Sequence, residues 1–260
     1  MSKFIDKLEQ ASRSFSLPMG FRVAPTVSRP RMVLVAHLSQ ADIDSPADYV
    51  AGADAGLLGV TSMGPGVRIL KGVVKAAPDI PWGVWPDSIS RGGMEQIGKA
   101  GGDFLFFPAD KTPLSVVPAE KMGKVLVTEA LLNDGLIRAI NKLPADAVFI
   151  TSQQPEKCGL TWRYLMLLRY SADLLSRPLL VPVPSDIDGD ELQALWDVGV
   201  DGVVVGVAAG QPAGRLKELR RMIDSLTPPS KWKRKQARAI VPSLKEEALP
   251  IIEEEEEEGE

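Results

Sequence analysis

Four apolar runs in this sequence begin in the same way, with a small residue and an aspartate, and their spacing constrains the fold. The aspartates are Asp54, Asp103, Asp146 and Asp201, which lie 49, 43 and 55 residues apart. Four further apolar runs are interleaved with them and are introduced by Arg31, Pro81, Lys124 and Arg177. This spacing predicts eight strands, each followed by a segment long enough for one helix.

The segments between the apolar runs have the composition and the capping residues of helices. We expect strands at 31–37, 56–61, 82–86, 103–107, 124–129, 147–151, 178–183 and 202–207. We expect helices near 45–54, 65–77, 90–100, 115–122, 133–142, 160–175, 188–198 and 212–225. Strands that alternate with helices through short loops indicate an α/β protein. The strands are nearly continuous apolar runs, as is typical of a parallel sheet that is covered on both faces.

Two arrangements of such a sheet are open, a closed barrel and an open doubly wound sheet. The count of eight, with no run that has the features of an edge strand, favours a closed (βα)8 TIM barrel. Active sites of such barrels lie at the C-terminal ends of the strands. Residues 2–12 predict a short amphipathic helix, with Phe4, Ile5 and Leu8 on one face, and we expect it to plug the N-terminal end of the barrel.

Composition excludes several classes of protein. A chain of 260 residues is close to the usual length of one α/β barrel. Cys158 is the single cysteine, so neither a disulfide framework nor a cysteine metal cluster is expected. The sequence has no apolar run of membrane-spanning length, and its first residues do not resemble a signal peptide. We therefore expect a cytoplasmic protein without a transmembrane segment.

The C-terminal residues differ in character from the rest. Residues 229–260 contain six basic and nine acidic side chains, a net charge of −3, which leaves −1 of the total −4 for residues 1–228. A nearly neutral barrel gives no reason to expect nucleic acid as a partner. The tail combines a basic block at 231–238 with six glutamates at 253–258, and like-charge runs of this kind are typically disordered. We predict a barrel domain at 1–228 and a charged tail at 229–260, through which a partner could bind.

The most specific motif lies in the last quarter of the barrel. Residues 199–208 read Gly-Val-Asp-Gly-Val-Val-Val-Gly-Val-Ala, after a turn Pro-Ser-Asp-Ile at 184–187. A phosphate is bound by several converging backbone N–H groups, and glycine lets the chain approach it closely. A following helix adds the positive end of its dipole. The predicted phosphate-binding residues are Ser185, Ile187, Gly206, Val207, Ala208 and Gly210.

This run resembles the closing quarter of the phosphate-binding (βα)8 barrels. That superfamily includes indole-3-glycerol-phosphate synthase, phosphoribosylanthranilate isomerase, thiamine-phosphate synthase and the tryptophan synthase α subunit. The run matches the typical ending except for one serine, which is Val207 here. Two further departures are Pro184, which has no N–H to donate, and Asp186 and Asp188, which would repel a phosphate if they pointed toward it. The resemblance implies an enzyme acting on a small phosphorylated metabolite.

Polar residues at the other strand ends supply candidates for catalysis. Glu129 ends the fifth strand among apolar residues, and a positioned carboxylate there suits proton transfer; its position is similar to that of an acidic residue in the indoleglycerol-phosphate synthase group. A helix-terminal carboxylate or an ion pair with Lys111 is the alternative. Lys111 follows the fourth strand and could bind a substrate carboxylate or phosphate or form a Schiff base, or it could be a solvated loop residue.

His37 and Asp87 complete the set of candidates. His37 is the single histidine, so the multi-histidine metal sites of metal-dependent epimerases are not expected, and it is either an acid/base group or a residue of the barrel wall. Asp87 follows the third strand, where it is either functional or a helix cap. We predict no metal.

Three functional hypotheses follow from the sequence. The first is a lyase or isomerase that acts on a small phosphorylated metabolite, with Glu129 as the general acid/base and Lys111, His37 and Asp87 assisting. The second is a non-catalytic barrel that binds or assembles through its tail, since the strand ends reproduce no complete catalytic set of a known family. The third is a barrel that binds FMN through the same phosphate site. Association with further copies of the chain is left open.

Overall fold

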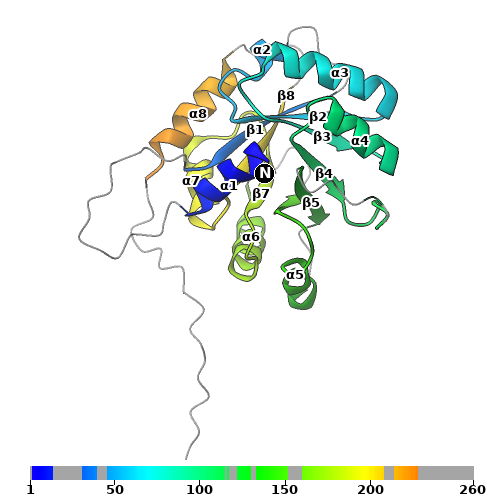
Figure 1. Ribbon diagram of the computed structural model, residues 1–260. Helices are drawn as coiled ribbons and strands as arrows, with labels where there is room; N and C mark the ends of the chain where they lie inside the picture. The colour runs from blue at the N-terminus through cyan, green and yellow to red at the C-terminus, as the bar shows by residue number, and fades with distance from the viewer. Residues whose placement is uncertain are drawn as a thin grey trace, which may run out of the picture. The chain divides into compact units, whose positions relative to one another are not determined.

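The computed structural model describes residues 2–13, 31–39, 46–114, 116, 122–129, 133–151, 160–207 and 214–227. Within these residues, eight parallel strands form a closed barrel in the order β1 to β8 (Figure 1). The predicted closed (βα)8 barrel is therefore confirmed, and the open sheet is excluded because β1 pairs with β8. The chain divides into two units, Met1–Pro228 and Pro229–Glu260, and the described residues all belong to the first.

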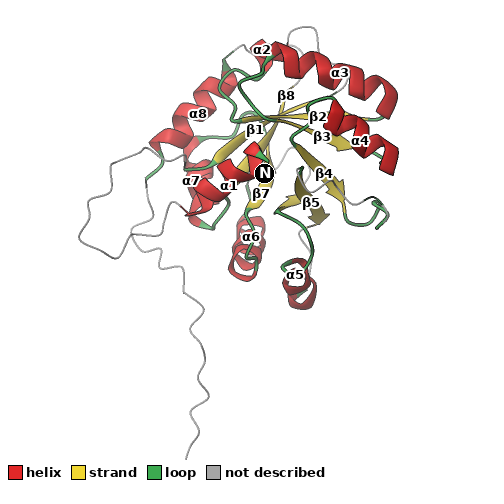
Figure 2. Cartoon of the chain, viewed as in Figure 1, coloured by secondary structure: helices red, strands yellow, loops and turns green. Residues whose placement is uncertain are grey.

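The helices and strands follow one another as the sequence predicts (Figure 2). The strands are β1 (Val33–Leu38), β2 (Ala55–Val60), β3 (Trp82–Pro86), β4 (Phe104–Pro108), β5 (Gly123–Glu129), β6 (Ala147–Thr151), β7 (Leu179–Val183) and β8 (Gly202–Val207). The helices are α1 (Lys3–Arg13), α2 (Pro46–Tyr49), α3 (Met63–Ala76), α4 (Arg91–Lys99), α5 (Asp134–Ile140), α6 (Trp162–Leu174), α7 (Gly189–Asp197) and α8 (Arg215–Ser225).

The predicted strand boundaries are correct to within two residues. The largest error in a helix is at 45–54, where α2 ends at Tyr49. The chain turns there, and Gly52 has a φ of +104°, a left-handed conformation that ends a helix. The helix predicted at 115–122 lies largely outside the described residues, and so does the tail at 229–260.

The four repeated aspartates stabilise the N-terminal end of the barrel. The Asp54 carboxylate accepts a hydrogen bond from the Leu34 N–H at 2.9 Å, while the Asp54 N–H donates to the Leu34 carbonyl at 2.8 Å. The same reciprocal pair recurs at the starts of β6 and β8. The pairs are Asp146 with Lys124 and Asp201 with Leu179. Each aspartate thus anchors the start of an even-numbered strand to the odd-numbered strand before it.

Asp103, the fourth aspartate, uses its carboxylate differently. Its N–H still donates to the carbonyl of Trp82 in β3. Its carboxylate, however, accepts hydrogen bonds from the Ser2 hydroxyl and from the N–H groups of Lys3 and Phe4, at 2.7–3.0 Å. A carboxylate at this position satisfies the free N–H groups of the first helical turn and interacts favourably with the helix dipole. Asp103 therefore holds α1 at the end of the barrel.

Helix α1 closes the N-terminal end of the barrel, as predicted. Phe4 and Leu8 are fully buried and belong to the same cluster as the side chains of the barrel interior. The Phe4 ring stacks on Phe104 of β4, with centroids 3.9 Å apart. Gly83 of β3 gives this ring its space, because a Cβ there would lie 2.1 Å from the Phe104 ring.

The interior above Phe104 is filled by aromatic side chains. Phe106, Phe149 and Trp85 contact one another with ring centroids 5.2–5.8 Å apart. Interiors of such barrels are more often filled by branched aliphatic residues. The aromatic rings form a column from α1 towards the C-terminal ends of the strands. There the ring centroids of Trp85 and His37 are 5.3 Å apart. The barrel interior below Trp85 is consequently a packed core and not a pore.

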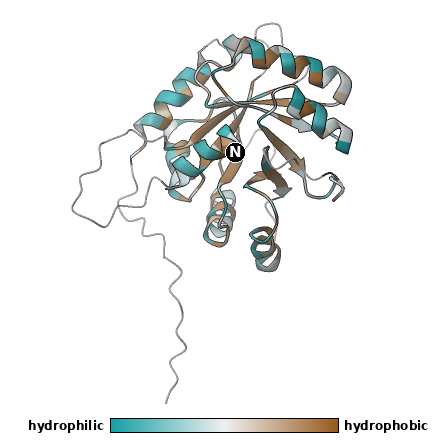
Figure 3. Ribbon diagram, in the orientation of Figure 1, coloured by the Kyte–Doolittle hydropathy of each residue, from teal (hydrophilic) through white to brown (hydrophobic). Residues whose placement is uncertain are grey.

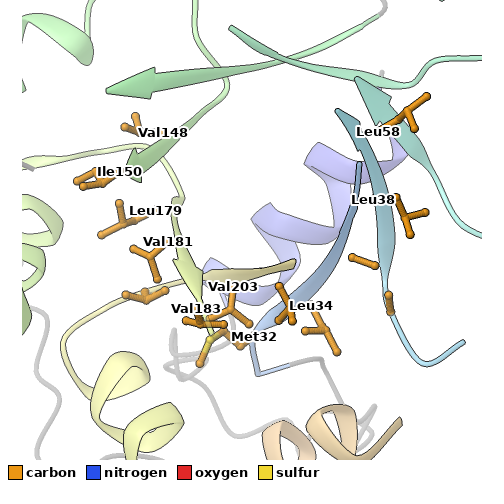
Figure 4. Close-up of a cluster of buried hydrophobic side chains, with 14 of the residues drawn as sticks. Met32, Leu34, Leu38, Leu58, Val148, Ile150, Leu179, Val181, Val183 and Val203 are labelled. Carbon is orange, nitrogen blue, oxygen red and sulfur yellow. The ribbon is translucent and has the colours of Figure 1, made fainter. Parts of the chain in front are cut away.

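A second apolar layer lies between the strands and the helices. The strands are hydrophobic along their length, whereas the helices are hydrophobic on one side only (Figure 3). Figure 4 shows side chains of this layer on the side of the strands turned away from α1, among them Leu34, Leu38 and Val181. Burial on both faces explains why the strands read as continuous apolar runs. None of the helices in the described part of the chain combines the length and apolar character needed to cross a membrane.

Prolines limit the backbone hydrogen bonding between β3 and β4 and between β6 and β7. β3 pairs with β4 only through Gly83–Phe104 and Val84–Leu105. The Trp82 carbonyl faces β4, so by alternation Pro86 also faces β4, where it has no N–H to donate. The carbonyl of Pro178, just before β7, faces β6. By the same alternation Pro182 of β7 also faces β6, and the pairing of these two strands ends at Phe149–Leu180. The segment β4–β6 is therefore bonded to its neighbours only near its N-terminal end.

The aspartate pairs can be tested by substitution of Asp146. We expect Asp146→Ala to lower the free energy of unfolding by about 1–3 kcal/mol, because the partly buried N–H of Lys124 loses its acceptor. Asp146→Asn keeps an acceptor oxygen and should lose less. Urea denaturation measures both. Asp79→Ala, at an exposed turn, is the matched control, and an equal effect of the two alanine substitutions would contradict this account.

Candidate functional site

The candidate site is the C-terminal mouth of the barrel, to which Glu129 contributes a carboxylate. Val125 and Val127 belong to the interior cluster, and side chains alternate between the two faces of a strand. Glu129, two residues further on, therefore lies on the inward face of β5, and it is exposed there. The exposure differs from the apolar surroundings that the sequence led us to expect.

His37 lies on the inward face of β1, on the opposite side of the barrel from β5. Val33 and Val35 belong to the interior cluster, and His37 continues their side of the strand. Its imidazole occupies space left by Gly59 of β2, where a Cβ would lie 3.0 Å from Nε2. Burial lowers the pKa of His37 below its ordinary value, because the charged imidazolium loses hydration. The imidazole is therefore neutral at pH 7 and can accept a proton.

Gly206 is the neighbour of His37 on β8. The two residues are paired in the parallel ladder, and Gly206 continues the inward face of Val204. A Cβ at Gly206 would meet nothing within 4 Å, so the space above this glycine is open. Sequence positions 37 and 206 are brought together only because β8 closes the barrel on β1.

The other residues predicted to bind phosphate are placed less favourably. Val207 is buried and continues the ladder opposite Leu38. The N–H of Ile187 donates to the Pro184 carbonyl at 3.4 Å, so this amide is engaged in a turn. Ser185 is partly buried at the same turn. Ala208 and Gly210 lie outside the described residues.

Arg215, the first residue of α8, organises the turn after β7. Its Nε donates to the Ser185 carbonyl at 2.7 Å and one Nη donates to the Ile187 carbonyl at 2.8 Å. The other Nη forms an ion pair with Glu218 at 2.7 Å. The carbonyls of Ser185 and Ile187 therefore point to α8. A guanidinium with five donors can form such a fork.

The aspartates of this turn do not both face a ligand. The Asp188 carboxylate accepts from the Glu191 N–H at 2.8 Å and caps α7, while the Glu191 side chain accepts from the Asp188 N–H at 3.4 Å. This capping box directs Asp188 toward its own helix. The repulsion expected between Asp188 and a phosphate is thereby reduced. Asp186 is exposed.

Lys111 and Asp87 both lie beyond the strand ends. Lys111 is exposed in the turn after β4, where its N–H lies 3.4 Å from the Pro108 carbonyl. Asp87 is exposed and its N–H donates to the Val60 carbonyl of β2 at 3.0 Å. The helix cap suggested for Asp87 is instead Ser90, whose hydroxyl accepts from the Gly93 N–H. Both residues follow the last residue of their strand, and no contact of either side chain with the other candidate residues is observed among the described residues.

Sequence reasoning missed three residues of the mouth, namely Trp85, Gly59 and Arg215. Trp85 could have been found from alternation along β3, which places it on the same face as Gly83. Gly59 and Arg215 have no comparable signal, because Gly59 makes room for the His37 side chain and Arg215 binds carbonyls of a distant turn. Within the described part of the chain, no group of three or more His, Cys, Asp or Glu residues is arranged to hold a metal ion.

Comparison with known proteins supports the fold. The structure resembles that of the α-subunit of tryptophan synthase from the hyperthermophile Pyrococcus furiosus, with a TM-score of 0.59 and 15% sequence identity, over 75% of this chain and 97% of that chain. Two single-residue mutants of that protein match over the same shares of the chains, with TM-scores of 0.57 and 0.59. At this identity the likeness shows the shared barrel fold. No protein-family model and no curated protein matches the sequence.

The burial of His37 predicts a pH dependence of stability. The unfolded chain binds a proton at His37 more readily than the folded chain, because burial lowers the pKa in the folded state. Above the pKa of about 6.5 for histidine in the unfolded chain, His37 has no effect on the free energy of unfolding. As the pH falls below that value, protonation of His37 in the unfolded chain lowers the free energy of unfolding. We expect His37→Gln to lose less stability than the wild type between pH 7 and pH 5, measured by urea denaturation. Parallel pH profiles for the two proteins would show that burial of His37 has no such effect.

Proposed function

We propose that the protein is a lyase or isomerase that acts on a small phosphorylated metabolite by acid/base chemistry at the barrel mouth. The observation that carries the proposal is the pairing of His37 with Gly206 in the ladder between β1 and β8. A proton acceptor and the open space above a glycine lie side by side, and Glu129 lies on the inward face across the mouth. A phosphate above Gly206 would hold its substrate between these two groups.

The proposed roles follow from exposure and charge. Glu129 is the general acid/base because its carboxylate is on the inward face of β5, at the mouth. Neutral His37 accepts or returns a second proton. Exposed Lys111 attracts the anionic substrate, and Asp87 lies at the rim. The phosphate is bound by backbone N–H groups near Gly206, supported by the turn that Arg215 holds.

The structural neighbours are named as subunits of tryptophan synthase, an enzyme. They support a catalytic barrel only as an analogy at the level of fold, because one fold carries many functions. The motif at 199–208, which resembles phosphate-binding barrels, supports the same conclusion independently. The non-catalytic barrel and the FMN barrel are the competing hypotheses.

A ligand titration tests the phosphate site and separates these hypotheses. The melting temperature is measured with inorganic phosphate, ribose 5-phosphate, glycerol phosphate or FMN. A ligand at 100 times its Kd stabilises the folded state by about 2.7 kcal/mol. We expect saturable stabilisation by the small phosphates, lost in Gly206→Asp, which places a carboxylate in the open space. Gly72→Asp is the matched control, since a Cβ there also meets nothing within 4 Å.

Each other outcome has a definite meaning. Stabilisation by FMN alone supports the flavin barrel. No stabilisation by any ligand at millimolar concentration overturns the phosphate site and favours the non-catalytic barrel.

The catalytic assignment is tested separately with Glu129→Gln. This change keeps the size and polarity of the side chain and removes its ability to exchange a proton. We expect turnover of the phosphorylated ligand identified by titration to fall by about 10²–10⁴-fold, while the ligand-induced rise in melting temperature is kept. Unchanged turnover would show that Glu129 is not the acid/base group.

A further inference from the structure

Strands β4, β5 and β6 form a section of the barrel that is bonded internally as far as the mouth. The pairing of β4 with β5 extends to Pro108, and that of β5 with β6 extends to Glu129. The Thr151 hydroxyl also donates to the Thr128 carbonyl at 3.2 Å. We call these three strands the small section. The ladders that join β7, β8, β1, β2 and β3 likewise reach the last residue of at least one strand in each pair, and these strands form the large section.

The two sections meet at two seams, β3–β4 and β6–β7, and a proline of the large section lies in each seam. Pro86 faces β4 and Pro182 faces β6, and neither has an N–H to donate. Pairing across each seam ends two residues before the proline. Proline within a sheet is otherwise confined to edge strands and bulges, and a closed barrel has no edge strand. The two prolines therefore turn the mouth ends of β4 and β6 into local edges.

Aromatic rings make the contact between the sections inside the barrel. Trp85 of the large section contacts Phe106 and Phe149 of the small section, with ring centroids 5.8 and 5.3 Å apart. Phe106 and Phe149 contact each other within the small section at 5.2 Å. Apolar contacts of this kind are not directional, so the rings can slide past one another where a ladder of hydrogen bonds would not yield.

The N-terminal end of each seam is held by backbone hydrogen bonds. The Asp103 N–H donates to the Trp82 carbonyl at 2.7 Å across β3–β4, and the Val148 N–H donates to the Pro178 carbonyl at 2.9 Å across β6–β7. The Asp103 carboxylate also holds α1 at this end. The small section is therefore attached where a hinge would lie, at the end of the barrel opposite the mouth.

The helices around the small section are joined in a way that permits the same motion. Before α6, the Leu160 N–H donates to Glu191 of α7 at 3.1 Å, and Arg169 of α6 donates to the Asp197 carbonyl at 3.5 Å, so α6 is tied to the large section. α5 and α6 lie side by side (Figure 1). Asn141, at the C-terminal end of α5, bonds the backbone at the C-terminal end of α6, which is again the end away from the mouth.

We propose that β4–β6 moves as one unit about its N-terminal end and thereby opens and closes the mouth of the barrel. Such a motion is a hinge closure. It changes the separation of Glu129, which is on the small section, from His37 and Gly206, which are on the large section. The admission of a phosphorylated ligand by this motion rests on the proposed function, whereas the motion itself does not.

Hydrogen exchange of single amides in the ligand-free protein, measured by NMR, tests the motion. The Ala109 N–H donates to β5 and the Val148 N–H to β7, so by alternation the N–H groups of Phe106 and Ile150 face the two seams. We expect both to exchange at least tenfold faster than the N–H of Val127, which lies inside the small section.

The order of exchange distinguishes a moving unit from fraying at the mouth. Phe106 is level with Val125 and is therefore further from the mouth than Val127, so fraying of the strand ends makes Val127 the faster of the two. Equal exchange of Phe106 and Val127, or faster exchange of Val127, overturns the proposal. A barrel that binds no phosphate can still show the predicted order, so failure of the proposed function is recognised separately by the ligand titration.

Replacing the two prolines should close the seams. Pro86→Val and Pro182→Val each supply an N–H that faces the small section, in a residue that favours strands. We expect the double variant to slow exchange at Phe106 and Ile150 at least tenfold. Pro78→Val, in an exposed turn, is the matched control and should change neither rate.

Unchanged exchange at both seams in the folded double variant would contradict the proposal. If the double variant does not fold, each single variant is measured at its own seam by the same criterion, with Phe106 reporting on Pro86→Val and Ile150 reporting on Pro182→Val.

Discussion

The barrel depends on one backbone interaction that recurs at the start of its even-numbered strands. An aspartate donates its N–H to the strand before it and, in three of the four cases, accepts the N–H of the same residue with its carboxylate, as Asp54 does with Leu34. These reciprocal bonds set the register between neighbouring strands. A slip of one residue would move every side chain of a strand to the opposite face of the sheet. In the remaining case, Asp103 binds α1 instead. The same residue type therefore both aligns the strands and closes the barrel.

The closure of the N-terminal end of the barrel by α1 determines where chemistry can occur. Phe4 of α1 stacks on Phe104, and the aromatic column above it reaches Trp85 and then His37. The aromatic rings fill the interior up to Trp85, which leaves the C-terminal ends of the strands as the place for a ligand of the barrel. Pairing of β4–β6 with the rest of the barrel is confined to the N-terminal end. The segment β4–β6, which includes Glu129, is thus bonded to β3 and β7 near the N-terminal end of the barrel and not at the mouth.

The site could be predicted only in part, because proximity at the mouth depends on barrel closure. Glu129 and His37 were identifiable as strand-end polar residues, and alternation along β5 and β1 places both inward. The pairing of His37 with Gly206, and the space that Gly59 leaves for the imidazole, depend on neighbouring strands. The engagement of the Ile187 N–H in a turn, and of the Ser185 carbonyl with Arg215, is likewise a product of local folding.

The strands, their number, their order along the chain and the helix that plugs the barrel were all predictable from the sequence. Period, spacing and apolar character are local properties, and the repeated aspartates mark the strand starts directly. Which side chains contact one another became known from the three-dimensional structure. It showed that the aspartates bind backbone, that aromatic rings fill the interior, and that Trp162, Met166 and Tyr170 face solvent. Contacts between distant residues depend on how strands and helices pack, and single-sequence patterns contain no information on that packing.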